Sequence, residues 1–243
     1  MAAVVSFPGS ISIVIPCYNE APLIESTVRT IHGYFRRHGA AFEIIAINDG
    51  STDQTMDILG RIRDELDGVV VLDNMQNRGK GYSVRKGIER AGGDFIIFTD
   101  ADLSTPIEEA ESFLTCIEDF DIVIASRKAR GARVVVHQPL YRERMGEMYN
   151  LLLKAVLMRG IDDTQCGFKL FSRKAGKDIF KRVTFDGFGF DAEALYLARK
   201  LGYKVKEAPV RWFHNPETKV RPIRDSIRML VELFLIRVRH REV

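Results

Sequence analysis

The sequence contains few cysteines and no long uninterrupted apolar segment. Its three cysteines, Cys17, Cys116 and Cys166, are far apart, with no Cys-x-x-Cys pair and no nearby group of histidines. Neither a disulfide framework nor a zinc site is predicted, and this usage suits a reducing cytoplasm. No run of about 18 apolar residues occurs, so a membrane-spanning helix is not expected. The first ten residues contain no Lys or Arg, which argues against an ordinary signal peptide.

Other common signatures are missing as well. The chain has no GxxxxGK[ST] loop, which argues against a kinase-type phosphate cradle, and it has no internal repeat. The 36 basic residues nearly balance the 33 acidic ones, so the net charge of +3 does not favour a nucleic-acid partner, and none is expected. The 243 residues, 46% of them hydrophobic, are enough for one large domain with a substantial core.

Short β-branched runs alternate with helical stretches through the first hundred residues. We predict strands at 11–15, 42–47, 69–72 and 95–98, with helices at 21–35, 53–66 and 82–89 between them. This alternation predicts right-handed crossovers and a mostly parallel sheet with helices on both faces, an α/β fold. We expect one domain over 1–243, made of a nucleotide-binding half (11–125), a less regular half (126–220) and a C-terminal helix (221–243).

Polar side chains follow each predicted strand. The loops are Pro16-Cys17-Tyr18-Asn19-Glu20, Asn48-Asp49-Gly50-Ser51-Thr52-Asp53, Asn77-Arg78-Gly79-Lys80-Gly81 and Asp100-Ala101-Asp102. Because the carboxyl ends of parallel strands meet at one sheet edge, where ligands bind, the loops belong to one site. An aromatic ring for base stacking, an acid to accept a ring N–H, a lysine for phosphate and an acid pair for a metal together predict a nucleoside-diphosphate site.

The acid pair Asp100 and Asp102 is the most informative of these features. It directly follows a buried apolar run, and acids at i and i+2 offer oxygen ligands to a hard cation that also holds substrate phosphates. Each loop also has a simpler explanation. The pair can be a solvated turn, Asp49 a turn acid and Asp53 a helix N-cap, while Tyr18 can be a packed surface aromatic. A chance occurrence of all four loops in one chain is much rarer than a chance occurrence of any one of them.

These loops resemble those of the inverting family 2 glycosyltransferases, which have the GT-A fold. Three further segments resemble the dolichyl-phosphate β-glucosyltransferase branch of the polyprenyl-phosphate glycosyltransferases. They are Asp102-Leu103-Ser104-Thr105-Pro106, Asp163-Thr164-Gln165-Cys166-Gly167-Phe168-Lys169 and Phe190-Asp191-Ala192-Glu193-Ala194-Leu195-Tyr196. The similarity extends from about Ile11 to Arg239, nearly the whole chain.

The resemblance implies transfer of a sugar, with inversion, from UDP-glucose or a related UDP-hexose to a polyprenyl or dolichyl phosphate. It implies that Asp49 accepts the uracil N3–H and that Asp100 and Asp102 address the diphosphate through Mg²⁺ or Mn²⁺, which makes Asp102 a candidate catalytic residue. The full set of implied nucleotide-sugar contacts is Pro16, Tyr18, Glu20, Asp49, Lys80, Asp100 and Ala101. The metal would neutralise the departing UDP.

A phosphate acceptor does not require a dedicated base. Its second pKa is about 6, so it is largely dianionic at neutral pH, and arginines are needed to hold it beside a diphosphate. The candidates are Arg127, after an apolar strand at 122–125, and Arg142 or Arg144, before a long helix; solvated surface arginines are the alternative. Asp163 is a candidate catalytic residue that supports the acceptor pocket, orients an arginine or acts as a base. It can also cap a turn.

The C-terminal segment is basic and amphipathic. From Arg221 onward there are six arginines and three acids, and Ile223, Ile227, Leu230, Phe234 and Val238 fall on one side of a helix. Arg224, Arg228, Glu232 and Arg239 fall on the other side. This pattern suits either a helix at a membrane surface or a helix packed on its own core, and residues 151–158 are a second such candidate.

We therefore expect a peripheral protein at the cytoplasmic face of a membrane, bound reversibly or through a membrane-protein partner. Two other functions stay open. One is transfer to a hydroxyl of a saccharide or small molecule, with Asp191 or Asp163 as the base. The other is a non-catalytic nucleotide-sugar-binding scaffold.

Overall fold

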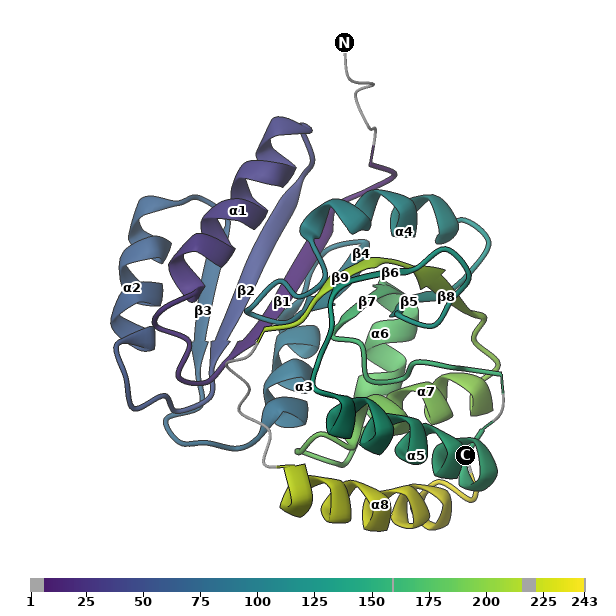
Figure 1. Ribbon diagram of the computed structural model, residues 1–243. Coiled ribbons are helices and arrows are strands. Elements are labelled where there is room, and N and C mark those ends of the chain that lie inside the picture. Colours follow the sequence, from purple (N-terminus) through teal and green to yellow (C-terminus); the bar gives the residue numbers. More distant parts are fainter. Residues whose placement is uncertain (1–6, 159, 216–221, 243) are drawn as a thin grey trace.

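A seven-stranded sheet runs through the computed structural model, which describes residues 7–158, 160–215 and 222–242 (Figure 1). In spatial order its strands are β3 (Val69–Asp73), β2 (Phe42–Asn48), β1 (Ile11–Cys17), β4 (Phe95–Thr99), β7 (Phe168–Ser172), β5 (Ile122–Ser126) and β8 (Val205–Pro209). All adjacent pairs are parallel except those made by β7, which runs antiparallel to both β4 and β5. The predicted strands and the mostly parallel α/β sheet are confirmed.

The central strands are apolar on both faces because helices cover both. In β1, Ile11, Ile13, Val14 and Ile15 have no exposed surface. Such continuous burial explains why the strand is rich in β-branched residues on both faces rather than alternating between apolar and polar ones, with Ser12 as a buried polar exception.

Each face of the sheet has its own hydrophobic cluster. The helices α1 (Ile24–Arg37), α2 (Thr55–Glu65) and α4 (Ala110–Cys116), with the short 3₁₀ helix η1 (Ile107–Glu109), pack on one face. On the other face are α3 (Lys80–Arg90), α6 (Arg173–Phe180), α7 (Phe190–Lys200), α5 (Leu140–Val156) and α8 (Pro222–Arg239). Helix α8 packs beside α5 and α7, and α5 and α8 form the lower edge of the view in Figure 1.

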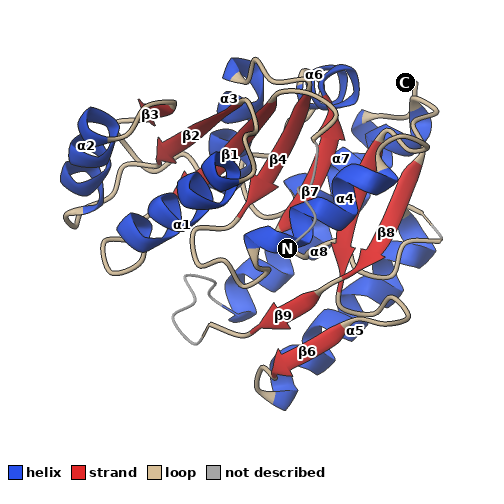
Figure 2. Ribbon diagram, turned by 90° about the horizontal axis from the view of Figure 1, so that it is seen from above, coloured by secondary structure: helices blue, strands red, loops and turns tan. Residues whose placement is uncertain are grey.

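A short two-stranded ribbon lies outside the main sheet (Figure 2). It consists of β6 (Arg133–Val136) and β9 (Arg211–Phe213), which pair in parallel. Trp212 on β9 is 8% exposed and belongs to the first hydrophobic cluster. The ribbon thereby brings an aromatic ring to the region beyond the carboxyl ends of β5 and β8.

Helix α8 forms as predicted, and Leu230 of its apolar stripe packs against the second hydrophobic cluster, but other members of the stripe are exposed. Phe234 is 60% exposed and Val238 is 71% exposed, whereas Glu232, from the opposite side, is only 4% exposed. The side chains of Ile223 and Ile227 are outside the described part of the structure. No helix among the described residues combines the length and apolar character needed to cross a bilayer.

Candidate active site

The predicted loops meet at the carboxyl edge of the sheet. The register pairs Cys17 with Asn48, so the loops after β1 and β2 start side by side. Asn19 joins them, because its backbone N–H donates to Ser51 Oγ (2.9 Å) and its Oδ1 accepts from Thr52 N (2.8 Å). Asn19 has φ of 54°, a left-handed conformation that asparagine tolerates better than most residues. Pro16, Tyr18 and Glu20 are thus carried next to the Asp49 loop.

Asp49 holds the following loop against this edge. It is 3% exposed; its Oδ1 accepts from Asn74 Nδ2 (2.8 Å) and Arg78 N (2.9 Å), and its Oδ2 accepts from Gly79 N (2.9 Å). Because a carboxylate offers about four acceptor positions, one remains for a ligand. That Asp49 accepts a uracil N–H stays a prediction. In the structure Asp49 also fixes the loop that leads into Lys80.

Lys80 is the first residue of α3, and it faces the acid pair. Its Nζ lies 2.7 Å from Asp100 Oδ1 and 5.3 Å from the centre of the Phe98 ring. Burial works against its positive charge, but Asp100 and Asp191 outweigh this and raise the pKa of Lys80. A permanent positive charge therefore lies where a donor diphosphate is expected.

Asp100 is packed against Gly167 of the Asp163–Lys169 segment. The Asp100 N–H donates to Gly167 O (3.1 Å), and a Cβ at Gly167 would lie 1.8 Å from Asp100 Oδ2. Only glycine leaves room for the carboxylate at this distance. Ala101 is 4% exposed, and its carbonyl accepts from Thr27 Oγ1 (2.5 Å), which ties the loop to α1. The backbone of the acid pair is therefore fixed from both sides.

Asp102 accepts hydrogen bonds only from Ser104 among those described, at 2.9 Å from both the backbone N and Oγ. Burial, and then the charge of Asp100, raise the pKa of Asp102. The described residues include no group of three or more His, Cys, Asp and Glu side chains that could hold a metal. Mg²⁺ commonly takes one or two carboxylates from the protein and the rest of its ligands from phosphates and water. Asp100 and Asp102 fit that kind of shared site.

Arg127 and Asp163 form a buried bidentate pair. Arg127 Nε and Nη2 donate to the two Asp163 oxygens (2.7 and 2.8 Å), and Arg127 N adds a third bond (2.9 Å). The Asp163 side chain has no exposed surface, and although burial opposes it, Arg127 lowers the pKa of Asp163. The guanidinium lies 5.1 Å from the centre of the Trp212 ring. Asp163 is thus bonded to Arg127, an arrangement that suits one of its three expected roles, which is to orient an arginine.

The comparison with known families decides the class of this chain. The family model described as "Glycosyl transferase family 2" matches residues 12–180. The chain belongs to this family. A dolichyl-phosphate beta-glucosyltransferase of Trichomonas vaginalis is 33% identical over 93% of the chain and 70% of that relative. The dolichyl-phosphate beta-glucosyltransferase of Drosophila melanogaster is 30% identical over 95% of the chain and 75% of that protein. Glycosyltransferase AglD of Haloferax volcanii is 32% identical over 94% of the chain, which corresponds to 37% of the length of AglD.

Solved structures share the fold of this glycosyltransferase. A mannosyltransferase from Pyrobaculum calidifontis, in complex with GDP-Man and Mn²⁺, has a TM-score of 0.64 and 20% identity, covering 96% of this chain and 65% of that one. Glucosyl-3-phosphoglycerate synthase from Mycobacterium tuberculosis, with Mn²⁺, UDP and its product, has a TM-score of 0.70 and 21% identity, covering 94% and 80%. The fold expected from the resemblance is confirmed.

A second buried ion pair lies behind the site of this glycosyltransferase. Lys169 Nζ donates to Asp191 Oδ1 (2.6 Å) and to Cys166 O (2.8 Å), and both side chains are almost fully buried. Burial raises the pKa of Asp191, while Lys169 and Lys80 oppose this. The role of Lys169 was not predicted. The available signal was a lysine within the apolar strand Phe168-Lys169-Leu170-Phe171, which requires an internal partner.

The two other arginines predicted to bind the acceptor phosphate, Arg142 and Arg144, lie on α5. Arg142 lies on α5, and its side chain is outside the described part of the structure. Arg144 is on the same helix, 83% exposed, with its Nη1 3.5 Å from Glu147 Oε2. The structure therefore brings Arg127, and not Arg144, into a buried ion pair at the sheet edge.

Two acids near the motifs have structural partners. Asp53 accepts from Ala21 N (3.1 Å) and from Thr55 N (3.0 Å), so it links the first two loops. Glu193, with no exposed surface, accepts from Thr184 N and Phe185 N, both at 2.9 Å, and lies 2.7 Å from His240 Nε2. Glu193 therefore joins the end of α8 to α7.

Proposed function

We propose that this glycosyltransferase moves glucose, or a closely related hexose, from its UDP derivative to the phosphate of a polyprenyl or dolichyl lipid, with inversion at the anomeric carbon. Support comes from relatives that are dolichyl-phosphate beta-glucosyltransferases over most of the chain. The observation that carries the proposal is an acid pair and two cations at one sheet edge. Lys80 Nζ lies 2.7 Å from Asp100 Oδ1, and the charge of Asp102 also acts on Lys80. Burial opposes the charge of Arg127, but Asp163 and, to a smaller extent, the nearby Asp100 raise its pKa.

The donor half of the site would hold the nucleotide and its diphosphate. Tyr18 and the remaining acceptor position of Asp49 suit a base and its N–H, and Lys80 offsets phosphate charge. Mg²⁺ or Mn²⁺ bound at Asp100 and Asp102 would stabilise the charge on the UDP leaving group. The protein contributes the rigidity, because Gly167 and Thr27 fix the loop that carries both acids.

The acceptor half would hold a phosphate dianion. Arg127 uses Nε and one N–H of Nη2 to bind Asp163, which leaves Nη1 and the second N–H of Nη2 as donors. An acceptor oxygen forms a bond to the anomeric carbon as the bond from that carbon to the UDP oxygen breaks. No proton has to leave the nucleophile, so Asp163 would act as a positioning residue rather than a base.

A hydroxyl acceptor would need a base, and Asp191 is the better suited of the two candidates. Burial raises its pKa, which is the direction a base requires, whereas the pKa of Asp163 is lowered. Asp191 is also 3% exposed and held by Lys169, which makes proton transfer from a bound alcohol difficult. The phosphate acceptor is therefore the preferred substrate class.

The test is transfer from a panel of radiolabelled UDP- and GDP-sugars to a short polyprenyl phosphate, with Mg²⁺ or Mn²⁺. We expect metal-dependent label in the organic phase from a UDP-hexose. Label in the lipid from none of the donors, together with retained UDP binding, would contradict the proposal. We also propose that the enzyme works at the cytoplasmic face of a membrane, where its lipid is found, with or without a membrane-protein partner.

A further inference from the structure

Exposed hydrophobic side chains are concentrated on two neighbouring helices. Nine of the thirteen large hydrophobic residues that are exposed in the described structure lie on α5 and α8. We call this set the α5–α8 face: Leu140, Tyr141, Met148, Leu151, Leu152, Val231, Phe234, Leu235 and Val238. The two helices pack side by side, so these exposed side chains lie on neighbouring elements. Such a concentration of exposed apolar side chains is typical of an interaction site.

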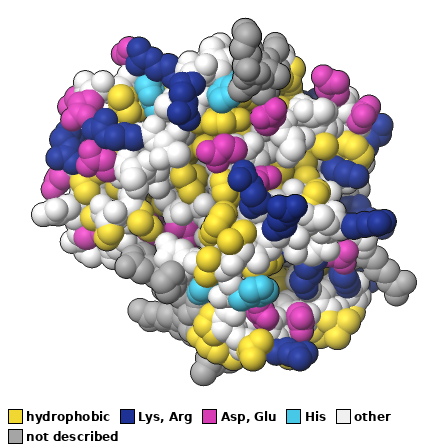
Figure 3. All heavy atoms as spheres, turned by 45° about the horizontal axis from the view of Figure 1, so that its top comes forward, with side chains coloured by type: hydrophobic (Ala, Val, Ile, Leu, Met, Phe, Trp, Pro, Cys, Tyr) yellow, Lys and Arg dark blue, Asp and Glu magenta, His cyan; other side chains and the backbone are white. Residues whose placement is uncertain are grey.

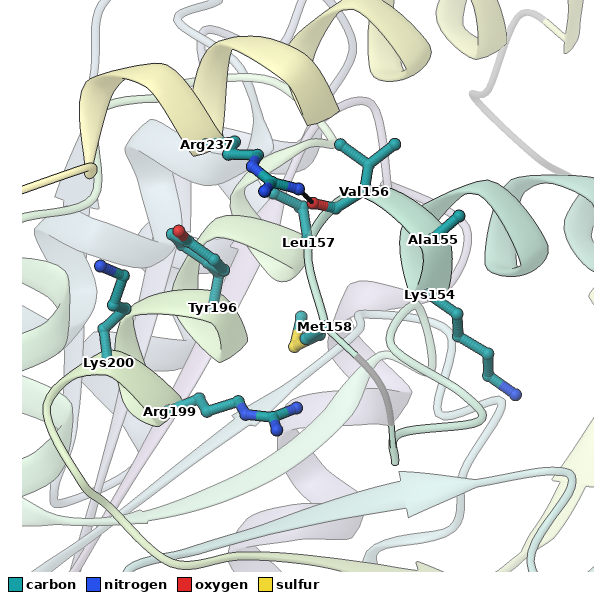
Figure 4. A pocket seen from close by; sticks show the side chains of 9 residues that line it. All are labelled: Lys154, Ala155, Val156, Leu157, Met158, Tyr196, Arg199, Lys200 and Arg237. Carbon is teal, nitrogen blue, oxygen red and sulfur yellow. Dashed lines mark hydrogen bonds between the residues drawn. The ribbon is translucent and has the colours of Figure 1, made fainter.

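A basic hollow lies between the ends of α5, α7 and α8, next to this face. It has a volume of about 580 Å³. Its lining residues are Lys154, Ala155, Val156, Leu157, Met158, Tyr196, Arg199, Lys200 and Arg237 (Figure 4). Four of the nine lining residues are cationic and none is acidic, so the hollow favours an anion.

The basic side chains of the hollow are arranged around its apolar floor. In Figure 4 the guanidinium groups of Arg237 and Arg199 lie on opposite sides of Met158. Arg237 Nη1 donates to Val156 O (2.7 Å), which fixes one guanidinium and leaves further N–H groups for a ligand. The charge of Lys154 is offset by its ion pair with Asp162. Lys200 Nζ donates to Arg241 O (3.3 Å), which neutralises no charge. The cations of the lining that we test for anion binding are Arg199, Lys200 and Arg237.

The opposite edge of the molecule offers an internal comparison. A smaller hollow on α1 is also basic, lined by Arg29, Thr30, Gly33, Arg36 and Arg37. There Arg29 bonds to Glu25 and Glu65, and acidic and basic side chains alternate over the α1 and α2 side in Figure 3. None of the described residues of α1 or α2 is an exposed large hydrophobic. Of these two hollows, only the one beside α8 combines positive charge with an apolar surface.

We propose that the α5–α8 face docks on an anionic phospholipid bilayer, with the basic hollow receiving phosphate-bearing headgroups. The apolar stripes enter the headgroup boundary, and the flanking cations meet the negative surface, as expected of an interfacial helix. This inference deepens the proposed function and rests on it, since a polyprenyl phosphate is presented at a bilayer. It concerns a binding site distinct from the transfer site at the sheet edge.

The experiment is flotation of the full chain with vesicles of phosphatidylcholine alone or with added phosphatidylglycerol. We expect binding to the anionic vesicles, weakened about 25-fold by Arg199→Gln/Lys200→Gln if each cation near the surface contributes about fivefold. The matched control is Arg36→Gln/Arg37→Gln, because both pairs are exposed and lie in the last turn of a helix. The control pair should bind like the unchanged chain.

Other variants separate the alternatives. Phe234→Gln/Val238→Gln changes two exposed side chains and should also weaken binding to anionic vesicles. Arg237→Gln should weaken it too, and it replaces the Arg199→Gln/Lys200→Gln variant if that variant does not fold. Equal binding to neutral vesicles, equal loss in the Arg36 and Arg37 control, or undiminished binding after the Arg199 and Lys200 change would each overturn the proposal. Complete loss of binding to anionic vesicles in millimolar inorganic phosphate would also overturn it, because the hollow would then be a site for free anions.

The same preparations keep the two proposals separate. Transfer to a short, water-soluble polyprenyl phosphate needs no bilayer and reports on the proposed function alone. Flotation without added donor reports on the docking face alone. Loss of flotation with transfer intact would overturn docking, whereas flotation with no transfer from any donor would support docking and contradict the transfer reaction.

Discussion

Asp102, which is half-buried, and Asp163, which is buried, are two acids at the same sheet edge with opposite surroundings. Asp102 has only Ser104 as a hydrogen-bond partner in the described structure, and burial raises its pKa. Asp163 is enclosed by Arg127, which lowers its pKa against the effect of burial. The difference indicates what each can do. An acid that forms no direct ion pair can recruit a metal, whereas an acid whose charge is already neutralised by an ion pair serves to hold its partner in place.

Asp102→Asn should give the largest change on the donor side. Loss of one metal ligand removes several kcal/mol of leaving-group stabilisation, so we expect transfer to fall by about 10²- to 10³-fold. Stability should not fall, because a half-buried acid with a raised pKa is removed. Asp53→Asn is the matched control, since Asp53 joins two loops and is not expected to bind metal; it should retain metal-dependent transfer. Equal losses in both variants would contradict the assignment.

Asp163→Asn tests the acceptor side. It leaves Arg127, whose side chain is 22% exposed, without its partner, and loss of one member of a largely buried pair costs about 3–5 kcal/mol in the free energy of unfolding. Chemical denaturation measures this, and the double variant Asp163→Asn/Arg127→Gln should recover part of it because the uncompensated charge is gone. Transfer should fall in both variants. If Asp163→Asn lost transfer while keeping full stability, a direct chemical role for Asp163 would replace the positioning role.

The same pair predicts an acid limit. The folded-state pKa of Asp163 is below its ordinary value of 3.8, so the pair stabilises the fold above that value. This stability is lost as pH falls from about 3.8 through the lower folded-state pKa. Acid unfolding of the unchanged chain and of Asp163→Asn should therefore differ less as pH drops in this window. A constant difference across it would contradict the ion pair.

Gly167→Ala should act on the metal site without removing a ligand. The new Cβ would lie 1.8 Å from Asp100 Oδ2, so the carboxylate must move. We expect metal affinity to fall about 10- to 100-fold, the size seen when the support of a ligand is lost. Gly60→Ala on α2 is the control, because no described atom outside its own helix backbone lies within 4 Å of the position that the added methyl group would take; it should leave affinity unchanged. Titration with Mn²⁺ in the presence of UDP measures both.

The smallest expected effect is the pH dependence of metal binding. Asp102 must be deprotonated to bind a cation, and its folded-state pKa is raised above 3.8. As pH falls, Mn²⁺ affinity should therefore decline earlier than an ordinary aspartate would allow. Titrations across mildly acidic pH measure this, with Asp102→Asn as the reference that lacks the titrating group. An identical pH profile in both proteins would mean that Asp102 is not a ligand.

The donor loops could be predicted from sequence because each directly follows an apolar strand. Parallel strands bring their carboxyl ends together, so Asp49 and Asp100 were assigned to one edge without knowledge of any contact. What could not be predicted were contacts between distant segments. The sequence pattern does not state that β7 inserts antiparallel between β4 and β5, or that Gly167 leaves space for Asp100. These depend on which strand pairs with which.

Helix α8 shows a second limit. Its period was visible, but the buried side depends on what packs against it, and that information lies in α5 and α7. Phe234 and Val238 are exposed while Glu232 and His240 are buried, and Glu193 of α7 bonds to His240. An amphipathic pattern alone therefore predicts a helix without telling which of its sides meets the core.

The central claim is that the nucleophile is a lipid phosphate. Its most direct test offers the enzyme radiolabelled UDP-glucose with equal amounts of a polyprenyl phosphate and the matching polyprenol, and identifies the labelled lipid by chromatography. The account predicts metal-dependent label on the phosphate lipid only, with that label lost in Arg127→Gln. Label on the polyprenol at a comparable rate, or undiminished phosphate labelling in Arg127→Gln, would contradict it.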